Sequence, residues 1–132
     1  MVALLKDETR VDPLLLRLVM AERRLDLPSA DAHIADLAAR FDTARLRGDT
    51  IHRREEARFE LSLMQHPRQA LALAEANWTV QREPADALIL LETALASGQP
   101  RAAEPVRAWY RTNRVEDARI AGLIARLFPE GS

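Results

Sequence analysis

Prolines divide this 132-residue chain at intervals that indicate a repeating unit. Pro28, Pro67 and Pro100 each open a stretch in which apolar residues recur with helical spacing, and each stretch runs on to a bulky aromatic residue. Pro67 and Pro100 lie 33 residues apart, and two alternate openers, Asp49-Thr50 and Glu83-Pro84, lie 34 apart. A period in the thirties that contains two helices is typical of a stacked array of helix pairs.

Composition favours helices and excludes several classes of site. Apolar residues are 48% of the chain, Ala and Leu dominate among them, and only 4 glycines are present, which favours helix over sheet. The chain has no cysteine, so disulfides, thiolate metal sites and a cysteine nucleophile are excluded. The net charge is −1, which is not the basic excess expected of a nucleic-acid-binding protein. Without a run of about 20 apolar residues, we expect no membrane insertion.

Local start and stop signals predict seven helices with short connections. Proline at a first helical position and glycine just past a helix end are the expected punctuation, and Gly48 and Gly98 fit the second role. The predicted helices begin at Pro13, Ser29 (as a cap), Asp49 or Thr50, Pro67, Pro84, Pro100 and Val115, and the last ends at Phe128. Short connections make consecutive helices antiparallel hairpins.

These signals together predict one all-α domain over residues 1–132. We expect an α-solenoid of about three antiparallel helix hairpins followed by a C-terminal capping helix. The seventh helix carries Arg119, Arg126 and Glu116 on one side, as a solvated cap would. Nothing comparable caps the front, so the chain is expected to be the C-terminal part of a longer repeat protein. Phe41, Trp78, Trp109 and Tyr110 are expected to pack between units rather than to serve as binding anchors.

Residues 84–114 carry a more specific pattern. Ala94 lies late in the first helix of this unit, Gly98 takes the turn, and Ala103 lies early in the second helix. Small side chains at such positions let paired helices approach closely. With these features residues 84–114 clearly resemble a tetratricopeptide repeat. The resemblance is looser in the rest of the chain, where for example Gln65 stands at the turn of the preceding unit that corresponds to Gly98.

The resemblance implies a non-catalytic scaffold for protein–protein interaction. In that family the first helix of each pair lines a groove that holds a partner protein or peptide. Carried onto this chain, the partner-binding residues are Glu55, Phe59 and Ser62 from one unit and Leu88, Glu92 and Leu95 from the next. Members that grip a C-terminal carboxylate use Lys, Asn and Arg on these faces, and neither Phe59 nor Glu92 matches them.

The charges of this groove allow two predictions about a partner. Glu55 and Glu92 would bias it toward basic residues. The dense run from Arg53 to Arg58 would instead form an arginine-bearing wall for acidic groups, although mixed runs are more often a solvated helix face.

Two other classes of function remain as alternatives. One is a structural segment of a larger assembly that self-associates as a homo-oligomer. The other is a helical-bundle metal protein or enzyme, for which the sequence offers only His52 with Glu55 or Glu56. The main prediction includes no catalysis, no cofactor and no nucleic acid. The compartment is cytoplasmic by default, or outside the cytoplasm if a longer parent chain carries a leader.

Overall fold

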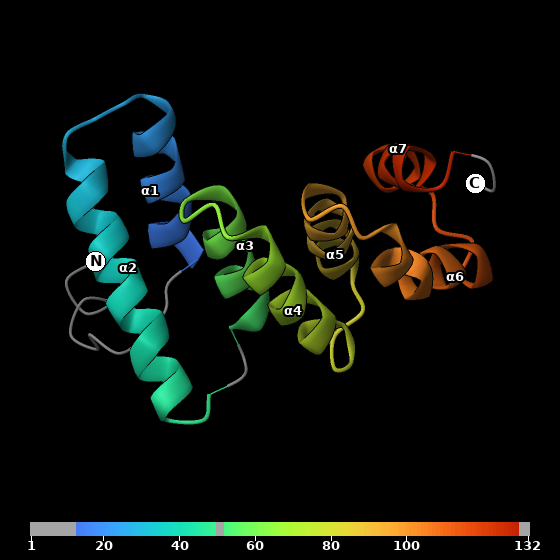
Figure 1. The fold of residues 1–132 in the computed structure, drawn as a ribbon, viewed down its shortest axis with the longest axis horizontal. Helices are drawn as coiled ribbons and strands as arrows, with labels where there is room; N and C mark the ends of the chain where they lie inside the picture. The colour runs from blue at the N-terminus through green and yellow to red at the C-terminus, as the bar shows by residue number, and fades with distance from the viewer. Residues whose placement is uncertain (1–12, 50–51, 130–132) are drawn as a thin grey trace.

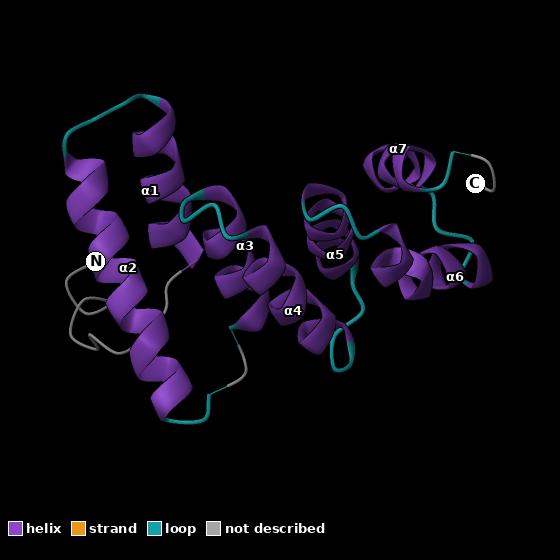
Figure 2. Ribbon diagram, in the orientation of Figure 1, coloured by secondary structure: helices purple, strands orange, loops and turns teal. Residues whose placement is uncertain are grey.

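The computed structural model describes residues 13–49 and 52–129, and over these residues the protein is all-α. Helices make up 76% of the described chain and no strand is present in it (Figure 2). The helices are α1 (Pro13–Arg24), α2 (Ser29–Leu46), α3 (Arg53–Ser62), α4 (Pro67–Trp78), α5 (Pro84–Ala96), α6 (Glu104–Thr112) and α7 (Ala118–Leu127), with a 3-10 turn, η2 (Pro100–Ala103), before α6. The predicted all-α fold class is therefore confirmed.

The helices follow one another as hairpins along the long axis of the molecule (Figure 1). Helix α1 packs on α2, α3 on α4, and α5 on η2 and α6. Successive hairpins meet where α1 contacts α3 and where α5 contacts both α4 and α3, and α7 packs on α5. This is the neighbour pattern expected of a short stack of helix hairpins, and it brings the odd-numbered helices to one side.

Helix starts follow from local chemistry at most positions. Pro67 and Pro84 occupy the first turns of α4 and α5, where a missing N–H costs nothing. Asp117 caps α7, because its carboxylate accepts hydrogen bonds from two backbone N–H groups of the first turn. The predicted starts of the third and seventh helices were a few residues early: α3 begins at Arg53 and α7 at Ala118.

The cap predicted at Ser29 is wrong. Ser29 is the first helical residue of α2 rather than its N-cap, and its hydroxyl donates a hydrogen bond to the Glu22 carboxylate of α1. Glu22 also contacts His33, with 2.6 Å between its Oε1 and the ring Nδ1. These two hydrogen bonds lower the pKa of the Glu22 carboxyl. A side chain expected to cap the start of the second helix therefore helps to join α1 to α2.

Left-handed residues occur at the connections that the repeat pattern predicts. Gly98 has a φ of 68°, and Gln65, at the matching turn of the preceding hairpin, has a φ of 58°. Asp26, at the turn between α1 and α2, has a φ of 55°. The three hairpin turns therefore share one backbone conformation, although glycine supplies it at only one of them.

Two apolar clusters form the core, and α3 contributes to both. Ala57 faces the C-terminal cluster, built mainly from α4 to α7, whereas Phe59 and Leu63 face the N-terminal cluster of α1 and α2. Alanines at the helix contacts are fully buried at Ala57, Ala70, Ala74, Ala87, Ala94 and Ala103. Their small side chains allow the close helix approach that the sequence pattern predicted.

The large aromatic residues pack as predicted. Trp78 is 5% exposed and meets Trp109 edge-on, with 5.3 Å between ring centroids. Phe41 is 2% exposed and lies against Phe59 at 5.1 Å. Trp109 and Tyr110 are partly buried against the C-terminal cluster.

Candidate partner-binding groove

Two hollows lie on the side of the molecule formed by α1, α3, α5 and α7. The proximal hollow, of about 390 Å³, is lined by Leu16, Arg17, Met20, Arg54, Glu55, Arg58, Ala85 and Ile89. The distal hollow, of about 570 Å³, is lined by Arg58, Leu88, Glu92, Ala118, Arg119, Gly122, Leu123 and Arg126. Arg58 borders both hollows. We call the two together the groove.

Helical spacing explains why these residues share a surface. On α5 the lining residues are 85, 88, 89 and 92, and on α7 they are 118, 119, 122, 123 and 126. Steps of three and four residues keep side chains on one face of a helix. The opposite face of α7, with Ile120 and Ile124, is buried in the core. One face of each helix therefore builds the core while another is left for the groove.

Three of the six residues predicted to bind a partner line the groove. Leu88 and Glu92 border the distal hollow, and Glu55 borders the proximal hollow. Leu88 and Leu95 both pack in part against the C-terminal core, but Leu95 borders neither hollow. Ser62 is also only partly exposed and lies outside both linings.

Phe59 does not offer a surface to a partner. It is 1% exposed, because its ring packs against Phe41 in the N-terminal core. Helix α3 has neighbours on both sides, so the face that carries Phe59 turns toward the first hairpin rather than toward solvent. The role in a groove that the repeat pattern implied for this residue is not compatible with its burial.

An ion pair crosses the groove between its two hollows. The Arg58 guanidinium of α3 donates two hydrogen bonds to the Glu92 carboxylate of α5, one of them at 3.0 Å between Nη1 and Oε1. The Arg58 side chain is 28% exposed and that of Glu92 34%. A forked arginine–carboxylate pair of this kind has a defined geometry. At this exposure it contributes little to stability and can exchange partners.

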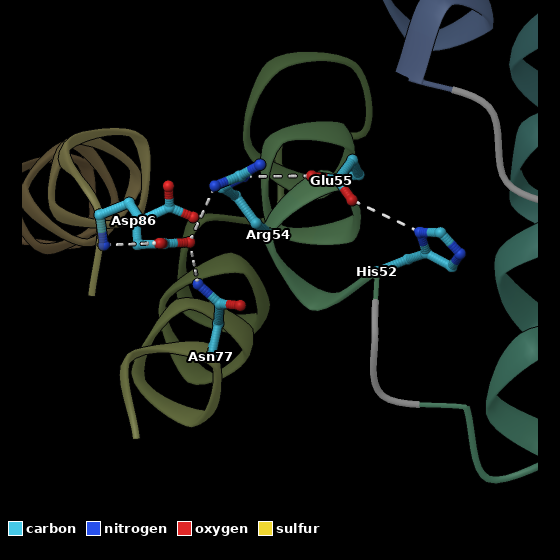
Figure 3. Close-up of polar contacts among 6 residues, drawn as sticks. His52, Arg54, Glu55, Asn77 and Asp86 are labelled. Carbon is cyan, nitrogen blue, oxygen red and sulfur yellow. Dashed lines mark hydrogen bonds and ion pairs between the residues drawn. The ribbon is translucent and has the colours of Figure 1, made fainter. Parts of the chain in front are cut away.

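A buried carboxylate lies beside the groove, where α3, α4 and α5 meet (Figure 3). Asp86 is fully buried, and its Oδ1 accepts hydrogen bonds from Asn77 Nδ2 at 2.7 Å and from Arg54 Nη1 at 3.2 Å. Its Oδ2 accepts from the backbone N–H of Glu83 at 2.9 Å and so caps α5. Arg54 extends from this site to Glu55, with 3.2 Å between Nε and Oε2. The network fixes the side chains of Arg54 and Glu55 at the rim of the proximal hollow.

A second buried carboxylate joins α2 to α3. The Glu56 side chain is 7% exposed and accepts a hydrogen bond from Arg45 Nη1 at 2.7 Å. Burial raises the pKa of the Glu56 carboxyl above its ordinary value, and the Arg45 charge acts in the opposite direction. Between the ordinary and the raised pKa, the folded protein therefore holds a proton that the unfolded chain has lost.

We expect Glu56→Gln to flatten the dependence of stability on pH just above the ordinary pKa of a glutamate. In the parent protein, the free energy of unfolding should fall as pH rises through this window, because the native state binds more protons than the unfolded state. Urea unfolding at a series of pH values measures the slope. The exposed-site variant Glu116→Gln should keep the parental slope, and an unchanged slope in Glu56→Gln would show that burial of Glu56 does not control it.

No metal centre is found in the part of the chain that the structure describes. No group of three or more His, Cys, Asp or Glu side chains within residues 13–49 and 52–129 is placed to hold an ion. The ring Nδ1 of His52, the residue behind the metal alternative, lies 3.5 Å from Glu55 Oε1, and the other oxygen of that carboxylate accepts a hydrogen bond from Arg54. In the same ranges, no helix combines the length and the apolar character needed to cross a bilayer.

The sequence-based prediction missed the outer walls of the groove. Arg17 and Met20 of α1 form one wall, and Arg119, Gly122 and Leu123 belong to the other. The arginines of α7 were predicted to be exposed, but only as part of a cap. Their spacing with Gly122 and Leu123 was the available signal, since it places a small residue and an apolar residue among exposed charges.

Comparison with known proteins identifies no relative of this chain. The sequence matches no protein-family model, and comparisons with curated proteins and with solved structures give no significant match. The tetratricopeptide-like character of residues 84–114 therefore remains a resemblance.

Proposed function

We propose that this protein is a non-catalytic, tetratricopeptide-like binding module that holds a segment of a partner protein in the groove. The observation that carries the proposal is that α1, α3, α5 and α7 each turn one face into the same pair of adjoining hollows. Leu88, Leu123 and Met20 supply apolar contact, and charged side chains border them. Grooves of this composition suit an extended or helical peptide segment.

Gly122 allows the groove to be blocked without disturbing the fold. A Cβ built at Gly122 meets no atom of the surrounding protein within 4 Å. Gly122 lies within α7, so replacement by leucine should also raise helix stability by about 0.5–1 kcal/mol. Gly122→Leu therefore places a side chain in the distal hollow of a protein that is at least as stable as the parent.

We expect Gly122→Leu to weaken the binding of partner peptides by about tenfold or more, since it occupies the hollow that receives them. The peptides are selected from a random library displayed on phage, with the purified protein as bait, and their affinities are measured by fluorescence anisotropy. Ala121→Leu is the matched control, because Ala121 is an exposed neighbour on α7 outside the groove lining. Equal affinities for the parent and Gly122→Leu would contradict binding in the groove.

Self-association is a second candidate, favoured by exposed leucines in the first hairpin. Leu46 is 89% exposed, Leu25 70% and Leu18 53%. An interface between two copies of the chain would cover them. Sedimentation velocity over a range of concentrations distinguishes this candidate: a constant monomer mass rejects it, and a dimer that Leu46→Glu dissociates supports it.

A further inference from the structure

The lining of the groove is positively charged although the chain is not. Within the described part of the chain, five arginines and two glutamates border the two hollows, whereas the whole chain has a net charge of −1. The arginines come from three of the four helices that line the groove: Arg17 from α1, Arg54 and Arg58 from α3, and Arg119 and Arg126 from α7. Positive charge is therefore concentrated on the surface proposed to receive a partner.

Both glutamates of the lining are already paired. Glu92 accepts two hydrogen bonds from Arg58, and Glu55 accepts one from Arg54. These pairs reduce the attraction that either carboxylate has for a basic partner group. The prediction that Glu55 and Glu92 favour basic residues is thus weakened by their neighbours.

Three arginines of the lining keep their charge available. Arg17, Arg119 and Arg126 are exposed, and within residues 13–49 and 52–129 no ion pair engages them. They stand on opposite walls, one on α1 and two on α7. Guanidinium groups placed in this way bind carboxylates through forked, charge-assisted hydrogen bonds.

The composition of the lining favours an acidic peptide over a nucleic acid. Among the residues that the structure describes, no aromatic side chain borders either hollow, so bases would find no stacking platform there. Leu88 and Leu123 lie among the charges of the distal hollow and would instead contact apolar side chains. A segment that mixes acidic and apolar residues fits both features.

We propose, building on the binding function above, that the groove recognises an acidic and apolar peptide segment, and that Glu92 acts as an internal competitor for its carboxylates. Glu92 holds Arg58 in the free protein. An incoming carboxylate then takes the place of Glu92 on Arg58, while Arg119 and Arg126 bind neighbouring acidic groups. Because the Arg58–Glu92 pair is about one-third exposed, exchanging its partner costs little.

The experiment uses fluorescein-labelled peptides of four Glu-Leu-Ser repeats, with Gln-Leu-Ser and Lys-Leu-Ser repeats and single-stranded oligo(U) RNA as comparisons. Anisotropy titrations should show the acidic peptide binding at least about tenfold more tightly than the neutral peptide, with affinity falling as salt is raised. No detectable binding of the acidic peptide at millimolar concentration, or tighter binding of the RNA, would overturn the proposal.

Two sets of variants test the named residues. The double variant Arg119→Gln, Arg126→Gln should weaken binding of the acidic peptide about tenfold or more. The control is the double variant Arg68→Gln, Arg101→Gln, which makes the same change in net charge at exposed sites outside the groove. This control should change the affinity for the acidic peptide little. Glu92→Gln should tighten binding by about threefold to tenfold, because it releases Arg58. Weaker or unchanged binding in Glu92→Gln would reject the competitor role.

The results separate this inference from the proposed function. If the neutral or basic peptide binds best and Gly122→Leu abolishes that binding, the groove binds partners but does not select acidic ones. If Gly122→Leu leaves the binding of every peptide unchanged, the groove is not the binding site and both proposals fail.

Discussion

Replacing Asp86 by alanine is expected to lower the free energy of unfolding by about 3–5 kcal/mol, as removal of one partner from a buried charge network commonly does. The carboxylate is fully buried and accepts hydrogen bonds from Asn77, Arg54 and the backbone N–H of Glu83. Without it, the buried amide of Asn77 loses an acceptor and α5 loses its capping box. Urea unfolding followed by circular dichroism at 222 nm measures the loss.

Two companion variants separate the contributions at this site. Asp86→Asn keeps the volume but offers only one accepting oxygen to three donors, so it should recover only part of the lost stability. Arg54→Ala should cost about 1–2 kcal/mol, since the Arg54 side chain is 34% exposed and the remaining acceptors can still serve Asn77 and the helix cap. A loss below about 1 kcal/mol in Asp86→Ala would show that the three helices are joined by apolar packing alone.

The all-α fold could be predicted from the sequence because its determinants are local. Pro67 and Pro84 fix the first turns of α4 and α5, and Gly98 supplies the left-handed turn after α5. Helical spacing of alanine and leucine then identifies the side of each helix that packs. Because the connections are short, consecutive helices pack against each other as antiparallel hairpins.

The groove was less predictable because it depends on how one hairpin is rotated against the next. Helical spacing made Phe59 and Leu88 equally good candidates for the groove, yet Phe59 is buried against the first hairpin and Leu88 borders the distal hollow. Local periodicity defines faces on a single helix, but it does not say which neighbour covers each face. The contribution of α7 has the same origin: the sequence shows an amphipathic helix, and only its position against α5 turns Arg119 and Leu123 into a wall.

Asp86 shows a second limit of sequence reasoning. In the sequence it is an acidic residue in the first turn of a helix, where a solvated carboxylate near the helix dipole is the ordinary expectation. Its burial arises because Asn77 and Arg54, 9 and 32 residues away in the chain, are brought to it by α4 and α3. The signal is a set of three polar residues on three helices, and no single segment contains it.

Trp78→Ala is expected to lower the free energy of unfolding by about 3–5 kcal/mol, the usual cost of deleting a large buried aromatic side chain. Trp78 is 5% exposed at the end of α4 and packs edge-on against Trp109. The Arg82 guanidinium lies 5.8 Å from the Trp78 ring centroid, which adds a cation–π contact. The ring therefore ties α4 to α6 and to the connection before α5.

The surroundings of Trp78 place the expected loss toward the lower end of that range. A hollow of about 600 Å³ between α4 and α6 is lined by Trp78 and Trp109. Deleting the ring would extend this open hollow rather than create a sealed void, so water and side-chain movement can relieve part of the cost. Trp78→Phe should lose clearly less, because it keeps an aromatic ring against Trp109. Urea unfolding monitored by circular dichroism, which does not depend on the deleted fluorophore, gives the comparison.

The Trp78 variant also separates stability from binding. Trp78 borders neither hollow of the groove, whereas Gly122→Leu blocks the groove and should stabilise α7. At a temperature where Trp78→Ala is still folded, its affinity for a selected peptide should match that of the parent. The opposite pattern is expected for Gly122→Leu, with stability kept and affinity lost.

A loss of stability below about 1 kcal/mol in Trp78→Ala would mean that the ring is not an organising part of the core. A loss of affinity in the folded variant would place the binding surface on the α4–α6 side of the molecule.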